Sequence, residues 1–185
     1  PALPVTPLVT APPPPPTPPI VPPSGGTVHA TATIAPQWSD TWRTSRSMWG
    51  AWNAGTGLLF QGNGYGSGGT VVGLATYGDQ IPNLGASSID KAVLRVWRGA
   101  GGANAPASLT VQGTPAGSQP GGAPAPSGTA VTLPATGVGG WAEVELPADV
   151  REALRTGATK SFAAVGGTYS GWGGALTAGS MVLHL

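Results

Sequence analysis

Short runs of alternating hydrophobic and polar residues occupy most of the chain after residue 26, and this period of two is typical of half-buried β-strands. The clearest run is Ile89–Arg98, whose two faces are Ala92, Leu94 and Val96 against Lys91, Val93, Arg95 and Trp97. A second is Trp141–Leu146, with Ala142, Val144 and Leu146 inward. Similar or shorter apolar runs predict further strands at residues 27–34, 58–61, 70–76, 109–111, 130–133, 160–165 and 180–185.

One segment has a helical pattern. Pro147 to Arg155 places Val150, Ala153 and Leu154 on one side, and Gly157 follows as a terminator. The stretch Thr114–Gly128 is rich in Pro, Gly, Ala and Ser and is predicted to be a long loop. Many short strands with turn signals and one brief helix predict an all-β fold, a jelly-roll-like β-sandwich.

The first 26 residues have a different composition, with 12 of the 21 prolines. Proline fixes φ and removes a backbone donor, so this segment is predicted to be an extended, proline-rich N-terminal arm. Two interpretations stay open, a semi-rigid linker and an arm that docks on a neighbouring subunit. Aliphatic residues favour docking: Val5, Leu8, Val9, Ile20 and Val21. The predicted domains are therefore residues 1–26, the arm, and residues 27–185, the β-sandwich.

The amino-acid composition argues against several classes of function. Charged residues make up 8% of the chain and the net charge is +1, so no basic patch for nucleic acid is expected. The chain has no cysteine and no apolar run long enough to cross a membrane, so we expect no membrane insertion. No cofactor is expected and no metal site, since Asp40 and Asp79 alone fall short of the ligands that calcium needs.

Aromatic residues concentrate between Trp38 and Asp79, which holds four of the seven tryptophans and two of the three tyrosines. Three are expected in the core: Trp42, Phe60 and Tyr77. Four are the candidate ligand-binding residues on Gly-rich loops: Trp38, Trp49, Trp52 and Tyr65. The expected hydrogen-bonding neighbours of these rings are Asn53, Gln61, Asn63, Arg43 and Arg46. A subunit interface is the third use of such rings.

The sequence does not predict a catalytic site. Gly64–Gly69 fits the spacing of a dinucleotide fingerprint, but a predicted strand follows it where a helix is needed. Glu143 and Glu145 lie two apart on one strand, about 7 Å by strand rise, near the separation of an inverting glycosidase pair. The stronger interpretation is that both face solvent and pair with Lys91 or Arg95. His29 and His184 are expected to be structural.

Several of these segments together resemble the C-terminal β-sandwich module of minor tail or fibre proteins of actinobacterial tailed phages. The resemblance covers about residues 28–185 and rests on Trp38–Arg43, Phe60–Gly62 with Tyr65-Gly66, Tyr77–Ile81, the Ala92–Arg98 strand, the Pro-Gly-Ala loop, and the Trp141–Leu146 strand with its short helix and Gly157. The proline-rich segment is similar to the linkers that precede such modules.

The resemblance implies a non-enzymatic virion protein at the particle surface, anchored to other virion proteins through the arm and adhering to a cell-wall glycan of the host. It also implies a homo-oligomer, for which a trimer is favoured. The alternatives are a capsid decoration or head-fibre protein with a structural role only, a secreted non-catalytic carbohydrate-binding module, and a glycan hydrolase that uses Glu143 and Glu145.

Overall fold

The computed structural model describes residues 28–50, 58–65, 69–175, 177 and 180–185. Residues Thr31–Leu185 form one compact unit, and Pro1–Ala30 form a second unit. The arm predicted for residues 1–26 lies outside the described residues, so the arm and the domain division after it stay predictions.

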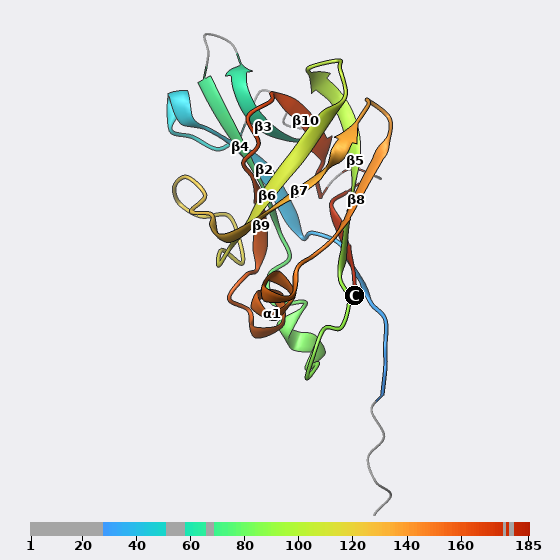
Figure 1. Cartoon of the computed structure of the whole chain (residues 1–185). Coiled ribbons are helices and arrows are strands. Elements are labelled where there is room, and N and C mark those ends of the chain that lie inside the picture. The colour runs from blue at the N-terminus through green and yellow to red at the C-terminus, as the bar shows by residue number, and fades with distance from the viewer. Residues whose placement is uncertain (1–27, 51–57, 66–68, 176, 178–179) are drawn as a thin grey trace, which may run out of the picture. The chain divides into compact units, whose positions relative to one another are not determined.

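The compact unit is built of antiparallel strands and a single α-helix, which confirms the all-β class with one short helix (Figure 1). The described strands are β1 (Thr33–Ile34), β2 (Trp38–Arg43), β3 (Leu58–Tyr65), β4 (Gly69–Thr76), β5 (Val93–Gly102), β6 (Ala107–Thr114), β7 (Ser127–Thr136), β8 (Trp141–Glu145), β9 (Ser161–Ala164), β10 (Ser170–Gly173) and β11 (Val182–His184). The helix α1 is Ala148–Thr156, and η1 (Thr44–Arg46) and η2 (Pro82–Leu84) are short 3₁₀ turns.

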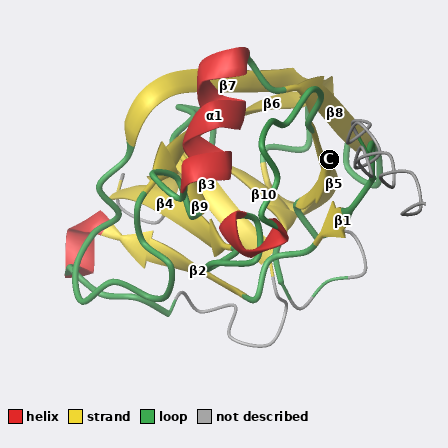
Figure 2. Cartoon of the chain, turned by 90° about the horizontal axis from the view of Figure 1, so that it is seen from below, coloured by secondary structure: helices red, strands yellow, loops and turns green. Residues whose placement is uncertain are grey.

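The strands pair in the order β1-β11-β5-β10-β3-β4-β9-β6-β7, with β2 added on β4 and β8 on β5. Strand β7, the last of this path, lies in contact with β8, so the sheet curls back toward itself (Figures 1 and 2). One face of each long strand therefore points to the inside of the curled sheet. Whether the curled sheet forms the two stacked layers of a jelly-roll sandwich stays a prediction.

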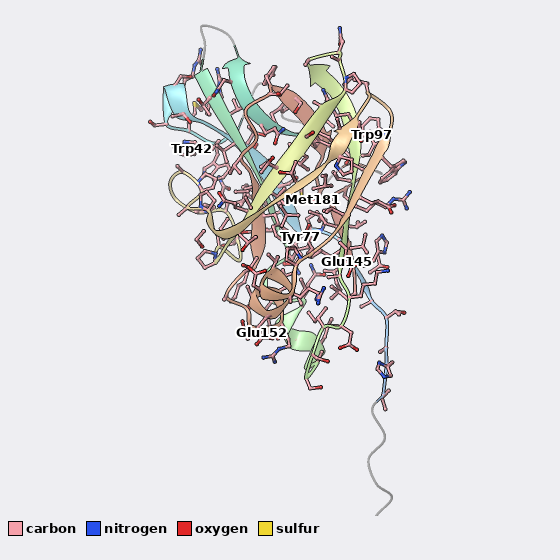
Figure 3. All side chains as sticks on the ribbon, in the orientation of Figure 1. Trp42, Tyr77, Trp97, Glu145, Glu152 and Met181 are labelled. Carbon is pink, nitrogen blue, oxygen red and sulfur yellow. The ribbon has the colours of Figure 1, made fainter. Side chains whose placement is uncertain are left out.

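Apolar side chains from almost every strand fill the inside of this curl, as the alternating pattern requires. The three aromatics assigned to the core are buried: Trp42, Phe60 and Tyr77. Tyr77 also donates its hydroxyl to the Met181 carbonyl oxygen at 2.6 Å, and both residues lie inside the molecule in Figure 3. Burial raises the pKa of the Tyr77 phenol well above its ordinary value.

Several strands depart from the sequence prediction. Strand β2 was not predicted, so Trp38, expected on a Gly-rich loop, lies within a strand. Strand β5 begins and ends later in the chain than the predicted Ile89–Arg98, at Val93 and Gly102. The strand predicted over residues 27–34 is β1, two residues long, and Val28 is 89% exposed. Its partner β11 has only three residues, so there is no strand beyond it for a longer β1 to pair with. Strand β10 was not predicted, because its sequence Ser-Gly-Trp-Gly has little β-propensity. Its Trp172 is fully buried, and packing of this ring fixes the segment in the sheet.

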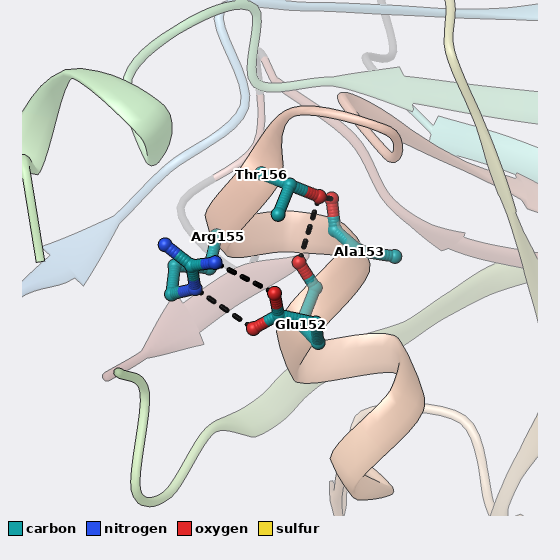
Figure 4. Close-up of polar contacts among 4 residues, drawn as sticks. All are labelled: Glu152, Ala153, Arg155 and Thr156. Carbon is teal, nitrogen blue, oxygen red and sulfur yellow. Dashed lines mark hydrogen bonds and ion pairs between the residues drawn. The ribbon is translucent and has the colours of Figure 1, made fainter. Parts of the chain in front are cut away.

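Helix α1 closes one end of the curled sheet (Figure 2), with Val150 and Leu154 in the core. It begins directly after Pro147 and ends at Gly157, whose φ of 77° is the left-handed geometry that glycine adopts freely. The last turn is braced on its exposed side (Figure 4). Arg155 donates two hydrogen bonds to the Glu152 carboxylate, which lower the pKa of Glu152, and the Thr156 hydroxyl donates to the Glu152 carbonyl.

One cation lies in the interior. Arg98, at the inner face of β5, is fully buried, and its guanidinium donates hydrogen bonds to the carbonyl oxygens of Gly99, Gly101, Gly171 and Ala103 at 2.6–3.3 Å. Its Cζ lies 5.3 Å from the centre of the Trp172 ring. Burial lowers the pKa of Arg98. The side chain therefore ties the glycine-rich end of β5 to β10.

Candidate aromatic binding site

Three tryptophans from the predicted aromatic segment come together on β2 and the turn after it. Trp38 and Trp42 lie four residues apart on β2 and so share a face of the strand. The chain then turns back through η1 and Ser47, which has a positive φ of 49°, and Arg43 pairs with Met48. This reversal brings Trp49 against the strand that carries the other two rings.

The three rings form an edge-to-face series, called here the Trp38–Trp49 cluster. The centre of the Trp49 ring lies 5.3 Å from that of Trp38 and 5.4 Å from that of Trp42, with interplanar angles of 76° and 71°. Such T-shaped contacts are the favoured arrangement of aromatic pairs. Trp42 is buried, whereas Trp38 and Trp49 are half-buried. The cluster therefore has one ring in the interior and two that reach the surface.

Hydrogen bonds fix the position of the surface rings. The indole N–H of Trp49 donates to the Pro120 carbonyl oxygen at 2.8 Å, so the Pro-Gly loop between β6 and β7 borders the cluster. Beside Trp38, the Ser39 hydroxyl accepts from the Ala175 N–H at 2.7 Å. A ligand that used these rings would meet a surface already held in place, which lowers the entropic cost of binding.

The remaining predicted contact residues are placed only in part. Trp52 and Asn53 lie outside the described residues, and Tyr65 ends β3 with its side chain outside the described part. The arm residues Val5, Leu8, Val9, Ile20 and Val21 also lie outside it. Arg46, expected beside the rings, is exposed in η1, Arg43 is half-buried on β2, and Asn63 is exposed on β3. The expectation for Gln61 is wrong, because its side chain is fully buried and hydrogen-bonded to the backbone of Ser108 and Thr110. The structure thus brings Trp38 and Trp49 together and joins them to Trp42.

The glutamate pair is on the outer face of β8 and takes part in ion pairs. Glu143 Oε1 lies 2.9 Å from Arg95 Nε, and Glu145 Oε1 lies 3.6 Å from Arg151 Nη1. Both carboxylate side chains are more than half exposed. A glycosidase acid needs apolar surroundings that keep it protonated, and an exposed carboxylate beside an arginine has the opposite environment.

The described part of the chain has few other side chains that could bind a metal ion or take part in a reaction. It holds no group of three or more His, Asp or Glu side chains that could bind a metal ion. His184 lies on β11, where its Nδ1 and the Thr33 hydroxyl of β1 are 3.1 Å apart. His29 lies outside the strands and is exposed. Among the described residues, no helix is long and apolar enough to cross a membrane.

A second pair of tryptophans was not singled out as a site from the sequence. Trp97 of β5 and Trp141 of β8 are directly opposite each other in the sheet, and Trp141 is 44% exposed. The alternation placed Trp97 on the outer face, but the pairing of β5 with β8 could not be read from it. The sequence did indicate that Trp141 points outward, because it directly precedes the inward Ala142 on the same strand.

No protein-family model, curated protein or solved structure was found to match this chain.

Proposed function

We propose that this chain is a non-enzymatic adhesion module of a tailed-phage particle, which binds a cell-surface glycan of its host through the Trp38–Trp49 cluster. The observation that carries the proposal is the pair of half-buried indole rings held edge to face, with Trp49 also edge to face with the buried Trp42. Two fixed aromatic surfaces beside polar groups are a common composition of ligand-binding sites.

The chemistry of the cluster suits a sugar. The apolar C–H face of a sugar ring packs on an indole, while its hydroxyls need hydrogen-bonding groups at the rim. The backbone of the Pro120 loop supplies polar groups beside Trp49, and Arg46 is exposed in the turn between β2 and Trp49. Because the rings already contact one another and Trp49 is hydrogen-bonded, little side-chain freedom is lost when a glycan binds.

The proline-rich arm supports the proposal that the chain is part of a phage particle. It holds 12 prolines in 26 residues and five scattered aliphatic side chains, a composition suited to an extended chain that docks on other virion proteins. The compact unit begins at Thr31, and Ala32 exchanges two backbone hydrogen bonds with Leu185. The proposal places this protein on the virion surface as a homo-oligomer, with a trimer favoured.

The test is a sedimentation assay with insoluble cell-wall polysaccharide purified from an actinobacterium. Wild-type chain is expected to sediment with the polysaccharide, and Trp49→Ala and Trp38→Ala to lose most of this binding. Leu84→Ala, which truncates another exposed apolar side chain, serves as the matched control and is expected to bind normally. Circular dichroism must show that each variant is folded. Full binding by folded Trp38→Ala and Trp49→Ala would rule the cluster out as the glycan site.

A further inference from the structure

The outer face of β5 and β8 carries a second aromatic surface. These strands pair directly, with Trp97 opposite Trp141 and Arg95 opposite Glu143. The opposite side of both strands is core, where Leu94, Val96 and Ala142 are buried. The four outward residues therefore form one contiguous surface, called here the Trp141 face. Trp42 of the first cluster and Trp97 of this face lie on opposite sides of the molecule in Figure 3.

Within this face, Arg95 lies between an aromatic ring and a carboxylate. Its Cζ is 4.2 Å from the centre of the Trp141 ring, a cation–π contact, and its Nε is 2.9 Å from Glu143 Oε1. The guanidinium occupies one face of the indole. Since the Trp141 side chain is nevertheless 44% exposed, its other face and edge remain accessible to a ligand.

Trp97 extends the surface over a glycine. Its Cζ3 lies 3.2 Å from the position that a Cβ on Gly99 would take, so the indole lies close over a residue without a side chain. The neighbouring strand β10 has Gly171 and Gly173 on either side of the buried Trp172. The Leu58 side chain also lies beside Gly99, and Gly171 and Gly173 are buried, so the outward aromatic surface here is that of Trp97 and Trp141.

The charges of this face balance one another. Arg95 pairs with Glu143, and Arg151 pairs with Glu145 at the end of the same strand, so two cations meet two carboxylates. The side chains of Glu143 and Arg95 are 55% and 39% exposed, which leaves both able to form further hydrogen bonds. An anionic or cationic polymer would meet a like charge here, whereas a neutral polyhydroxyl ligand would meet donors and acceptors only.

We infer that the Trp141 face is a second subsite for a neutral glycan of pyranose units. A sugar ring stacks on the free face of Trp141, and adjacent hydroxyls donate to Glu143 and accept from Arg95. This inference rests on the proposed function and extends it, because two glycan sites on opposite sides of one chain would let a single module contact a polysaccharide twice.

The experiment is isothermal titration calorimetry of the full chain with two neutral soluble polymers, mannan and α-glucan, and with dextran sulfate as the charged comparison. Trp141→Ala is expected to weaken binding of a neutral polymer about tenfold, the loss of one well-placed aromatic contact. Glu143→Gln is expected to weaken it as well without altering the fold. Val138→Ala, which truncates an exposed apolar side chain in the adjoining turn, is the matched control and is expected to leave binding unchanged.

The outcomes separate this inference from the proposal on which it rests. If Trp49→Ala weakens binding and folded Trp141→Ala and Glu143→Gln do not, the second subsite is wrong and the first stands. If wild type binds dextran sulfate and neither neutral polymer, the inferred ligand class is wrong. If Trp141→Ala instead changes the oligomeric state in light scattering, the face is a contact between copies of the chain and the inference is overturned.

Discussion

At the scale of single residues, Arg98 is a buried cation with a large expected effect on stability. Its guanidinium is fully buried and satisfies four backbone carbonyls around the glycine-rich end of β5. Burying the cation costs desolvation free energy, which is why the pKa of Arg98 is lowered. The hydrogen bonds to the carbonyls offset that cost, and without the guanidinium the buried carbonyls of Gly99 and Gly171 would lose this partner.

Arg98→Met is therefore expected to lower the free energy of unfolding by about 3 kcal/mol, because several buried carbonyls lose their partner. Arg95→Met, on the outer face of the same strand, is the control and is expected to cost less than about 1 kcal/mol, as exposed ion pairs contribute little. Urea denaturation measures both. Equal stability of the two variants would mean that the interior hydrogen bonds of Arg98 add nothing.

Tyr77 gives a prediction about pH. Its phenol is buried and its pKa is raised, so the folded chain keeps this proton at a pH where the unfolded chain, with a tyrosine pKa of about 10, releases it. The unfolded state then binds fewer protons, and stability falls as pH rises above about 10, by up to about 1.4 kcal/mol per pH unit from this group.

Tyr77→Phe is expected to be less stable than wild type at pH 8, because the Met181 carbonyl loses its hydrogen bond, and to show a shallower fall above pH 10. Urea denaturation at pH 8 to 11 measures both effects. Parallel stability curves for the two chains over this range would contradict the account of the buried phenol.

At the scale of elements, the crossing of β3 with the segment before β10 depends on one glycine. Gly62 has a φ of 100°, and a Cβ there would overlap the backbone of Thr168 and Tyr169. Gly64 on the same strand has a φ of 102° but has open space around it. The two positions therefore share the backbone strain and differ only in the close approach.

Gly64→Ala is expected to cost about 1–2 kcal/mol, the strain of a left-handed φ. Gly62→Ala is expected to cost about 1–3 kcal/mol more, because the added methyl group must push β3 and residues 168–169 apart. The difference between the two variants in urea denaturation isolates the packing effect. A Gly62→Ala chain no less stable than Gly64→Ala would show that the crossing tolerates an added side chain.

The elements that the sequence predicted well are those whose signal is local. Strands β5 and β8 follow from strict alternation, and α1 follows from Pro147 and Gly157 at its ends. Strand β10 was missed because its four residues include two glycines and its place depends on burying Trp172 against distant strands. Strand β1 was overextended because alternation says nothing about the length of the partner strand.

The sequence predicted the aromatic site only for residues that are close both in the sequence and in the folded chain. Trp38 and Trp42 share a face by strand geometry, whereas Trp49 reaches them through a left-handed Ser47 that has no clear sequence signal. The Trp141 face depends on the register of β5 with β8, which follows from the whole curled sheet. Tertiary pairing of this kind is not encoded in periodicity.

At the scale of the whole molecule, all residues of the described hydrophobic core belong to the compact unit Thr31–Leu185. The core cluster runs from Leu59 to Leu183, and β1 pairs with β11 at the edge of the sheet. A chain that lacks residues 1–26 is therefore expected to keep its Tm within about 3 °C and its affinity for glycan, since less than about 1 kcal/mol of stability is at stake. It is expected to lose its attachment to the particle.

Differential scanning calorimetry measures the Tm, and mass spectrometry of particles assembled with the shortened chain measures attachment. A fall in Tm of about 10 °C or more, on the order of what a loss of 3 kcal/mol gives in a domain of this size, would show that the arm is part of the fold. Normal incorporation into particles would show that attachment does not use the arm.

The central claim is that the chain binds a glycan and does not cleave it. The most direct measurement incubates the wild-type chain with insoluble actinobacterial cell-wall polysaccharide and records both the sedimented fraction of protein and the soluble reducing ends released over time. We predict saturable sedimentation, lost in Trp49→Ala, with no reducing ends above those of a protein-free control. Absence of sedimentation, or release of reducing ends that stops in Glu143→Gln, would contradict the account.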